Sequence, residues 1–120
     1  MWKRCTLLIP TCEASEAFEL DHNAHVEAWV KNDHLGFEIL YVFGGVVRKY
    51  RPDFIIRLKT GDLLILETKG QDTRRDKTKR RFLDEWVRAV NEHGGFGKWR
   101  WAVSKNPADV KIIIGDPAEL

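Results

Sequence analysis

The sequence predicts that residues 1–120 form a single α/β domain in which helices flank a mixed central sheet. The chain has 120 residues, of which 43% are hydrophobic and 32% are charged. This is the size and composition of one soluble globular domain. Along the chain the apolar pattern changes from a helical period to a strand period and back, which gives the order α–β–β–β–α–β. A helix between the last two strands makes them parallel, because a crossover returns the chain to its original direction.

Two helices are predicted at the start of the chain. Residues 11–20 fit a helix capped by Thr11, with an acidic residue in its first turn, where the helix dipole favours negative charge. Val26, Trp29 and Val30 have the i, i+3, i+4 spacing of an apolar helical face. We therefore expect a second helix here.

Three strands are predicted next, joined by two tight turns. Residues 37–43 and 46–58 are rich in β-forming residues, and Gly44-Gly45 between them suits a two-residue hairpin turn. Residues 59–61 suit a three-residue loop that ends in glycine. The apolar run that follows, residues 63–68, is typical of a central strand buried on both faces.

The last part of the chain predicts a long helix and two short strands. Residues 73–92 carry one apolar stripe, and two glycines at 94 and 95 end it. Residues 99–103 and 110–114 have strand character. Trp86 on the helix and Trp99 on the strand are of a type that can stack on bases, but their spacing favours a place in the core.

Composition also restricts the cellular location. No apolar run approaches the roughly 18 residues that a membrane-spanning helix needs. The two cysteines, Cys5 and Cys12, are too few for a disulfide scaffold; they could form a redox pair, but two free thiols are the simpler interpretation. We expect a cytoplasmic protein with no membrane partner.

The turn at residues 59–61 makes a geometric prediction. If it is a three-residue loop, Leu58 pairs with Asp62, and the same register sets Asp53 opposite Glu67. Lys69 lies two residues beyond Glu67 and therefore projects from the same face of the sheet. Two carboxylates and an ammonium group thus converge where a buried strand emerges.

These three residues predict metal-dependent phosphodiester chemistry. Charged groups at the end of a buried strand cost free energy unless they are paired or bound to a metal. Asp53 and Glu67 offer oxygen ligands for Mg²⁺, with Mn²⁺ as a substitute, and such an ion polarises a phosphoryl oxygen and activates water. Lys69 would orient that water or offset charge in the transition state. The alternative is a structural salt bridge between Lys69 and one of the carboxylates.

A basic segment follows the lysine. Between residues 69 and 81 there are seven basic and two acidic residues. A solvated helix face is one interpretation, and a nucleic-acid surface, which phosphates favour through counterion release, is the other. Within it, Arg75 and Lys79 lie one helical turn apart.

The spacing of the acidic motif resembles a known nuclease signature. Pro52-Asp53, thirteen residues and then Glu67-Thr68-Lys69 resemble the motif of the PD-(D/E)XK nucleases, and the predicted element order is similar to that of their restriction-endonuclease-like αβββαβ core. The chain is most similar to the C-terminal endonuclease domain of type III restriction enzyme subunits. That likeness covers about residues 13–103 and is carried by Glu13, Leu20-Asp21, Trp29-Val30-Lys31-Asn32, Leu35-Gly36-Phe37-Glu38-Ile39, Tyr50-Arg51-Pro52-Asp53-Phe54, Glu67-Thr68-Lys69-Gly70, Lys79, Trp86, Ala89-Val90-Asn91 and Gly97-Lys98-Trp99.

The resemblance implies a Mg²⁺-dependent endonuclease that cuts double-stranded DNA. It implies that Glu13 joins the two carboxylates as a third acidic residue of the catalytic metal site; Glu16, one helical turn further on, is the alternative. Gly70 would let the DNA backbone approach closely. Arg75 and Lys79 would contact its phosphates.

The chain also departs from the usual setting of that family. It has no Walker A loop, because Gly94-Gly95-Phe96-Gly97-Lys98 lacks the required spacing. Either a motor or recognition subunit is a separate protein, or this is an isolated domain. Cutting both strands would suit either a homodimer or two successive nicks. The other functions considered are a catalytically inactive nucleic-acid-binding module on the same fold, a structure-selective resolvase and an RNA-processing endonuclease.

Overall fold

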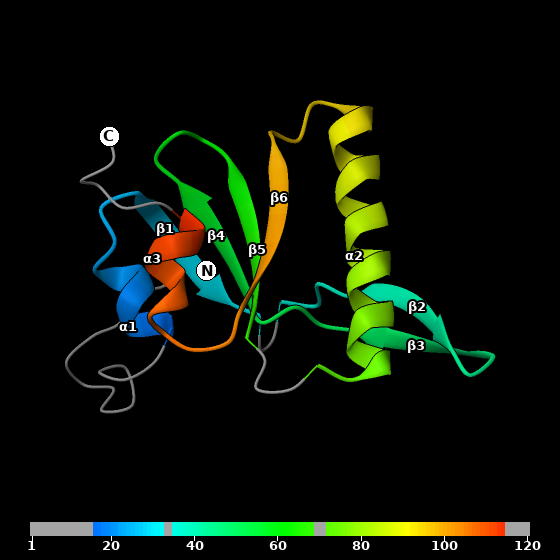
Figure 1. Ribbon diagram of the computed structural model, residues 1–120. Helices are drawn as coiled ribbons and strands as arrows, with labels where there is room; N and C mark the ends of the chain where they lie inside the picture. The colour runs from blue at the N-terminus through cyan, green and yellow to red at the C-terminus, as the bar shows by residue number, and fades with distance from the viewer. Residues whose placement is uncertain (1–15, 33–34, 69–71, 115–120) are drawn as a thin grey trace.

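The computed structural model describes residues 16–32, 35–68 and 72–114, shown in Figure 1. In chain order the elements are α1 (Glu16–Asp21), β1 (Val26–Lys31), β2 (Ile39–Phe43), β3 (Val46–Tyr50), β4 (Phe54–Leu58), β5 (Leu63–Thr68), α2 (Arg74–His93), β6 (Trp99–Ser104) and α3 (Asp109–Ile114).

The strands form two separate sheets. The larger has the order β1-β4-β5-β6, and β2 and β3 form a two-stranded hairpin. β4 is antiparallel to β1 and β5, whereas β5 and β6 are parallel. The predicted α/β class and the mixed sheet are therefore confirmed. The strands that precede and follow the long helix α2 in the sequence, β5 and β6, are parallel, as predicted.

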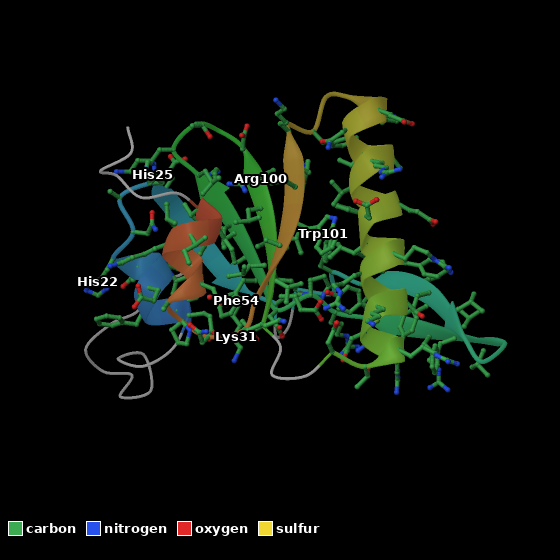
Figure 2. The ribbon with its side chains drawn as sticks, in the orientation of Figure 1. His22, His25, Lys31, Phe54, Arg100 and Trp101 are labelled. Atoms are coloured by element: carbon green, nitrogen blue, oxygen red, sulfur yellow. The ribbon has the colours of Figure 1, made fainter. Side chains whose placement is uncertain are left out.

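The larger sheet is covered on both faces. Side chains along a strand alternate between the two faces, so one strand contributes to the packing on each side. Leu64 and Leu66 of β5 pack in one apolar cluster with α1 and α3, and Ile65 packs in a second cluster with α2 and the hairpin. Figure 2 shows the same alternation on β6, where Arg100 and Trp101 lie on opposite sides. Central strand β5 is buried on both faces, as predicted.

The β4–β5 hairpin has the predicted register. The Leu58 N–H donates to Asp62 O at 2.9 Å, and the Gly61 N–H donates to Leu58 O at 2.9 Å. Gly61 has a φ of 92°, a left-handed conformation that favours glycine. Ile55 pairs with Ile65 and Phe54 with Leu66, so the predicted register holds up to the residue next to Asp53.

The long strand predicted over residues 46–58 is wrong in one respect. The turn at Gly44-Gly45 is confirmed, with φ values of 61° and 74°, but the chain breaks into β3 and β4 at residues 51–53. Pro52 lies there, is buried and has no N–H to donate to a strand partner. The chain thus leaves the small hairpin, passes Pro52 and enters the larger sheet.

The second predicted helix is a strand, β1. The register of β1 against β4 shifts between Val26 and Ala28, so one extra residue is inserted as a bulge. The bulge places Val26 and Trp29 in the same apolar cluster, although residues three apart on a regular strand face opposite sides. Because of the bulge, two buried residues on a strand have the three-residue spacing that is typical of a helix face.

The strand predicted over residues 110–114 is a short helix, α3. The carboxylate of Asp109 accepts from Lys105 N (2.9 Å) and Asn106 N (3.3 Å), and the Asn106 side chain accepts from Ala108 N (3.0 Å). These bonds are typical of a helix start. Val110 is then fully buried against the α1 side of the sheet, and this packing overrides the strand preference of a β-branched segment.

Helix α2 confirms the predicted helix over residues 73–92. Thr73 caps it: its hydroxyl accepts from Asp76 N at 3.1 Å, and the Asp76 carboxylate accepts from Thr73 N at 3.2 Å, a reciprocal capping box. Gly94 follows with a φ of 75°. Among the residues described, no helix is both long and apolar enough to cross a membrane.

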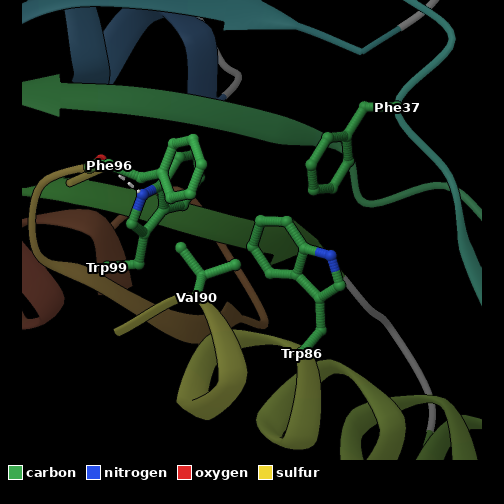
Figure 3. A pocket seen from close by; sticks show the side chains of 5 residues that line it. All are labelled: Phe37, Trp86, Val90, Phe96 and Trp99. Carbon is green, nitrogen blue, oxygen red and sulfur yellow. Dashed lines mark hydrogen bonds between the residues drawn. The ribbon is translucent and has the colours of Figure 1, made fainter. Parts of the chain in front are cut away.

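Near the C-terminal end of α2, aromatic side chains line a cavity of about 250 Å³, shown in Figure 3. Trp86 packs edge to face against Phe37 and Trp99, with ring centroids 5.1 and 5.3 Å apart. The indole N–H of Trp99 donates to Phe96 O at 2.9 Å. Trp86 and Trp99 therefore pack against the core, as predicted, rather than standing free as stacking platforms.

Candidate active site

Asp53 and Thr68 are hydrogen-bonded where β4 begins and β5 ends. Asp53 Oδ2 accepts from the Thr68 backbone N–H at 2.8 Å and from the Thr68 hydroxyl at 2.9 Å. Within the described part of the chain, Oδ1 of Asp53 accepts no hydrogen bond. One carboxylate oxygen is thus fixed by the protein and the other stays available to a ligand.

Asn32 forms hydrogen bonds to the backbone at Pro52 and Asp53. Its buried side-chain amide donates to Pro52 O and Phe37 O, each at 2.9 Å, and its backbone N–H donates to Asp53 O at 2.8 Å. These bonds satisfy carbonyl groups at the break between β3 and β4, where no regular sheet partner is present. Asn32 therefore fixes the backbone from which the Asp53 carboxylate projects.

Glu67 is a buried charged residue on the α2 side of the sheet. It is 2% exposed, and it lies two residues from Ile65, which faces α2. Asp53 lies at the bend just before β4, and its hydrogen bonds to Thr68, the residue after Glu67, bring it close to Glu67. The predicted register is confirmed as far as the pair of Phe54 and Leu66, and the convergence of the two carboxylates on one face of the sheet stays a prediction.

Tyr50 completes this side of the site. It is 3% exposed, and burial, followed by the negative charges of Glu67 and Asp53, raises the pKa of its hydroxyl above the ordinary value of 10.0. The hydroxyl is therefore a proton donor at neutral pH. A buried phenol beside two carboxylates keeps its proton and so adds no negative charge to the site.

Two basic residues of α2 turn toward this site. Lys79 Nζ lies 5.5 Å from the Tyr50 ring centroid and 4.0 Å from an oxygen of Asp76, and its side chain is only 18% exposed. The Arg80 side chain is 16% exposed and forms an ion pair with Asp72. The predicted solvent-facing basic surface is therefore wrong for these two residues and holds for Arg74, Arg75, Lys77 and Arg81, which are exposed.

The other predicted site residues divide into two groups. Glu13, Lys69 and Gly70 lie outside the described residues. Glu16 begins α1, which packs against the face of the sheet opposite to α2, so the structure does not bring it to the carboxylates. Arg75 is at the site's margin, where its Nε donates to the Tyr41 hydroxyl at 2.8 Å.

The carboxylate pair fits a hard divalent cation. No group of three or more acidic, histidine or cysteine residues that could hold a metal occurs in the described ranges. Mg²⁺ needs fewer protein ligands than that, because it retains several waters and is commonly held by one or two carboxylates. Asp53, through its available oxygen, and Glu67 are the residues that would hold it.

Three positioning residues were not singled out from the sequence. Tyr50 was treated as part of one continuous strand, which concealed its orientation toward the carboxylates. Asn32 lies within the segment predicted as the second helix, and Thr68 lies between the charged residues Glu67 and Lys69. The only signal for all three was their place in the segments that resemble the type III endonuclease domain.

A scan against protein-family models and searches of the curated proteins and of the solved structures found no match to this chain.

Proposed function

We propose that this protein is a metal-dependent endodeoxyribonuclease of the PD-(D/E)XK type, with a restriction-endonuclease-like fold, that acts on double-stranded DNA in the cytoplasm. One observation carries the proposal. Glu67 is buried at the end of β5, Asp53 just before β4 is hydrogen-bonded to the next residue, Thr68, and Tyr50 and Lys79 lie beside them. A purely structural role gives no reason to gather two carboxylates at the end of a buried strand.

The chain's own residues have separate tasks in this chemistry. Asp53 and Glu67 would hold Mg²⁺, which supplies Lewis acidity to a phosphoryl oxygen and lowers the pKa of bound water. Thr68 and Asn32 fix Asp53, and the buried Tyr50 lies beside Glu67. Lys69, which follows directly on β5, would orient the attacking water, and Lys79 would offset charge on the phosphate as it builds up in the transition state.

Incubation with supercoiled plasmid tests the proposal. Wild-type protein should convert the plasmid to nicked and linear forms with Mg²⁺ or Mn²⁺ and not with EDTA. Asp53→Asn and Lys69→Ala should abolish cleavage while the melting temperature stays close to that of wild type. Cleavage that survives in both variants, or a large loss of thermal stability in Lys69→Ala, would instead support a structural ion pair.

The same assay separates the neighbouring functions. A structure-selective resolvase would prefer branched DNA over a linear duplex, and an RNA-processing enzyme would cut RNA in preference to both. A catalytically inactive module would bind duplex DNA and cut none of these substrates. A separate motor or recognition subunit, or a second copy of this chain, would be revealed by a cleavage rate that depends on that added component.

A further inference from the structure

Two arginines without an acidic partner meet at Tyr41, next to the candidate active site. Tyr41 pairs directly with Arg48 across the β2–β3 hairpin, so both side chains project from the hairpin face that packs against α2. From the helix, Arg75 Nε donates to the Tyr41 hydroxyl at 2.8 Å. Arg75 therefore contacts Tyr41 from α2, and Arg48 is the cross-strand neighbour of Tyr41 in the hairpin.

Neither arginine has a carboxylate partner among the residues that the structure describes. In the described ranges, Arg48 and Arg75 form no ion pair, whereas Arg51, Arg80 and Arg88 each have a carboxylate partner. The Nε of Arg48 is buried and has no hydrogen-bond partner. Leaving a buried donor unsatisfied costs free energy. An anion that the remaining N–H groups of both side chains could reach would offset their positive charge.

The positions of Arg48 and Arg75 relative to Tyr50 and Lys79 indicate which anion they would bind. Arg75 lies one helical turn, about 6 Å, before Lys79, and Arg48 lies about 7 Å along β3 from Tyr50. Arg75 contacts Tyr41 as Lys79 contacts Tyr50. The same helix face thus carries two cation–tyrosine contacts, one beside the carboxylates and one a single turn away.

We propose that Arg48 and Arg75 together bind a second backbone phosphate of the DNA, adjacent to the phosphate engaged at Asp53, Glu67 and Lys79. Guanidinium groups suit this task because their planar forks match phosphate oxygens. Such a contact fixes the register of the backbone over the carboxylates and carries no sequence information. The proposal rests on the nuclease function and extends it to how the substrate is positioned.

Binding of a labelled synthetic DNA duplex in EDTA tests this site without cleavage. Arg48→Gln/Arg75→Gln should weaken binding about tenfold, because two charge-assisted hydrogen-bonding groups are lost. The slope of log affinity against log salt should fall by about one, for one phosphate contact. The matched control is Lys98→Gln/Lys111→Gln, which removes the same charge from exposed positions elsewhere.

The outcomes separate this proposal from the nuclease function. Equal losses in the two double variants would show a general charge effect and overturn the phosphate site. A loss confined to the arginine variant supports it, and the exposed single variant Arg75→Gln provides the same comparison if Arg48→Gln impairs folding. If wild-type protein cuts no plasmid but the arginine variant still binds duplex DNA less tightly, the nuclease function fails and the phosphate site stands.

Discussion

Asp53 and Thr68 are joined by two hydrogen bonds that attach the carboxylate before β4 to the last residue of β5. Both bonds end on the same oxygen, Oδ2, so the carboxylate plane is fixed while Oδ1 accepts no hydrogen bond from the described residues. This arrangement would orient Asp53 as the proposed metal ligand, in the way that the outer partners of metal sites do. It also explains why threonine, with a hydroxyl in addition to its N–H, is suitable at the position between Glu67 and Lys69.

Replacing the threonine hydroxyl tests this role. Thr68→Val keeps the backbone donor and the shape of the side chain but removes the 2.9 Å bond to Asp53. We expect a loss of about 1 kcal/mol in the free energy of unfolding and weaker binding of Mn²⁺ in calorimetric titration. Thr68→Ser should keep both near wild type. Wild-type Mn²⁺ affinity in Thr68→Val would show that Asp53 needs no such orientation.

Asn32 predicts a coupling between stability and activity. Asn32→Leu would leave two buried carbonyl groups, Pro52 O and Phe37 O, without their donor. We expect a loss of about 2–4 kcal/mol in the free energy of unfolding, measured by urea denaturation. Cleavage by the folded fraction should also fall, because the backbone of Asp53 is released.

The matched control for this variant is Asn91→Leu. Asn91 also makes two side-chain hydrogen bonds to backbone groups, both to Trp99, but at an exposed position. Its replacement should cost less stability and leave cleavage unchanged. Equal effects of the two replacements on cleavage would contradict a special role for Asn32.

The β4–β5 hairpin and the approach of Asp53 to Glu67 could be predicted because one loop length fixes the register of every pair. The residues that orient them could not. Tyr50 reaches the site only because Pro52 separates β3 from β4, and periodicity alone does not reveal where a strand changes sheets. The bulge in β1 brings Val26 and Trp29, three residues apart, to the same face of the sheet. The burial of Val110 against the α1 side of the sheet favours a helix for α3 over the predicted strand. In each case tertiary packing overrode a local preference.

The pKa of Tyr50 predicts a loss of stability at high pH. Burial and the neighbouring charges of Glu67 and Asp53 raise it above its ordinary value of 10.0, so above pH 10 the unfolded chain releases a proton that the folded chain retains. The free energy of unfolding therefore falls as pH rises, by up to about 1.4 kcal/mol per pH unit from this group. Below pH 10 the effect is absent.

Urea denaturation of wild type and Tyr50→Phe between pH 8 and pH 11 measures this contribution. The difference in unfolding free energy between the two proteins should be constant up to about pH 9.5 and then shift in favour of Tyr50→Phe. Lysine residues also titrate in this range, but they do so in both proteins and cancel in the difference. A constant difference up to pH 11 would place the Tyr50 hydroxyl in contact with water rather than with the carboxylates.

The last prediction separates Lys79 from the basic residues around it. Lys79 is packed over the Tyr50 ring, with a side chain only 18% exposed, whereas Lys77, two residues earlier on α2, is exposed. An ammonium group held at a partly desolvated site acts more strongly on a developing negative charge than one in water. We expect Lys79→Met to lower the single-turnover cleavage rate by about 10- to 100-fold, with a small change in duplex affinity. Lys77→Met should affect neither the rate nor, by more than about twofold, the affinity. Equal rates in the two variants would show that Lys79 only packs against Tyr50 and takes no part in the reaction.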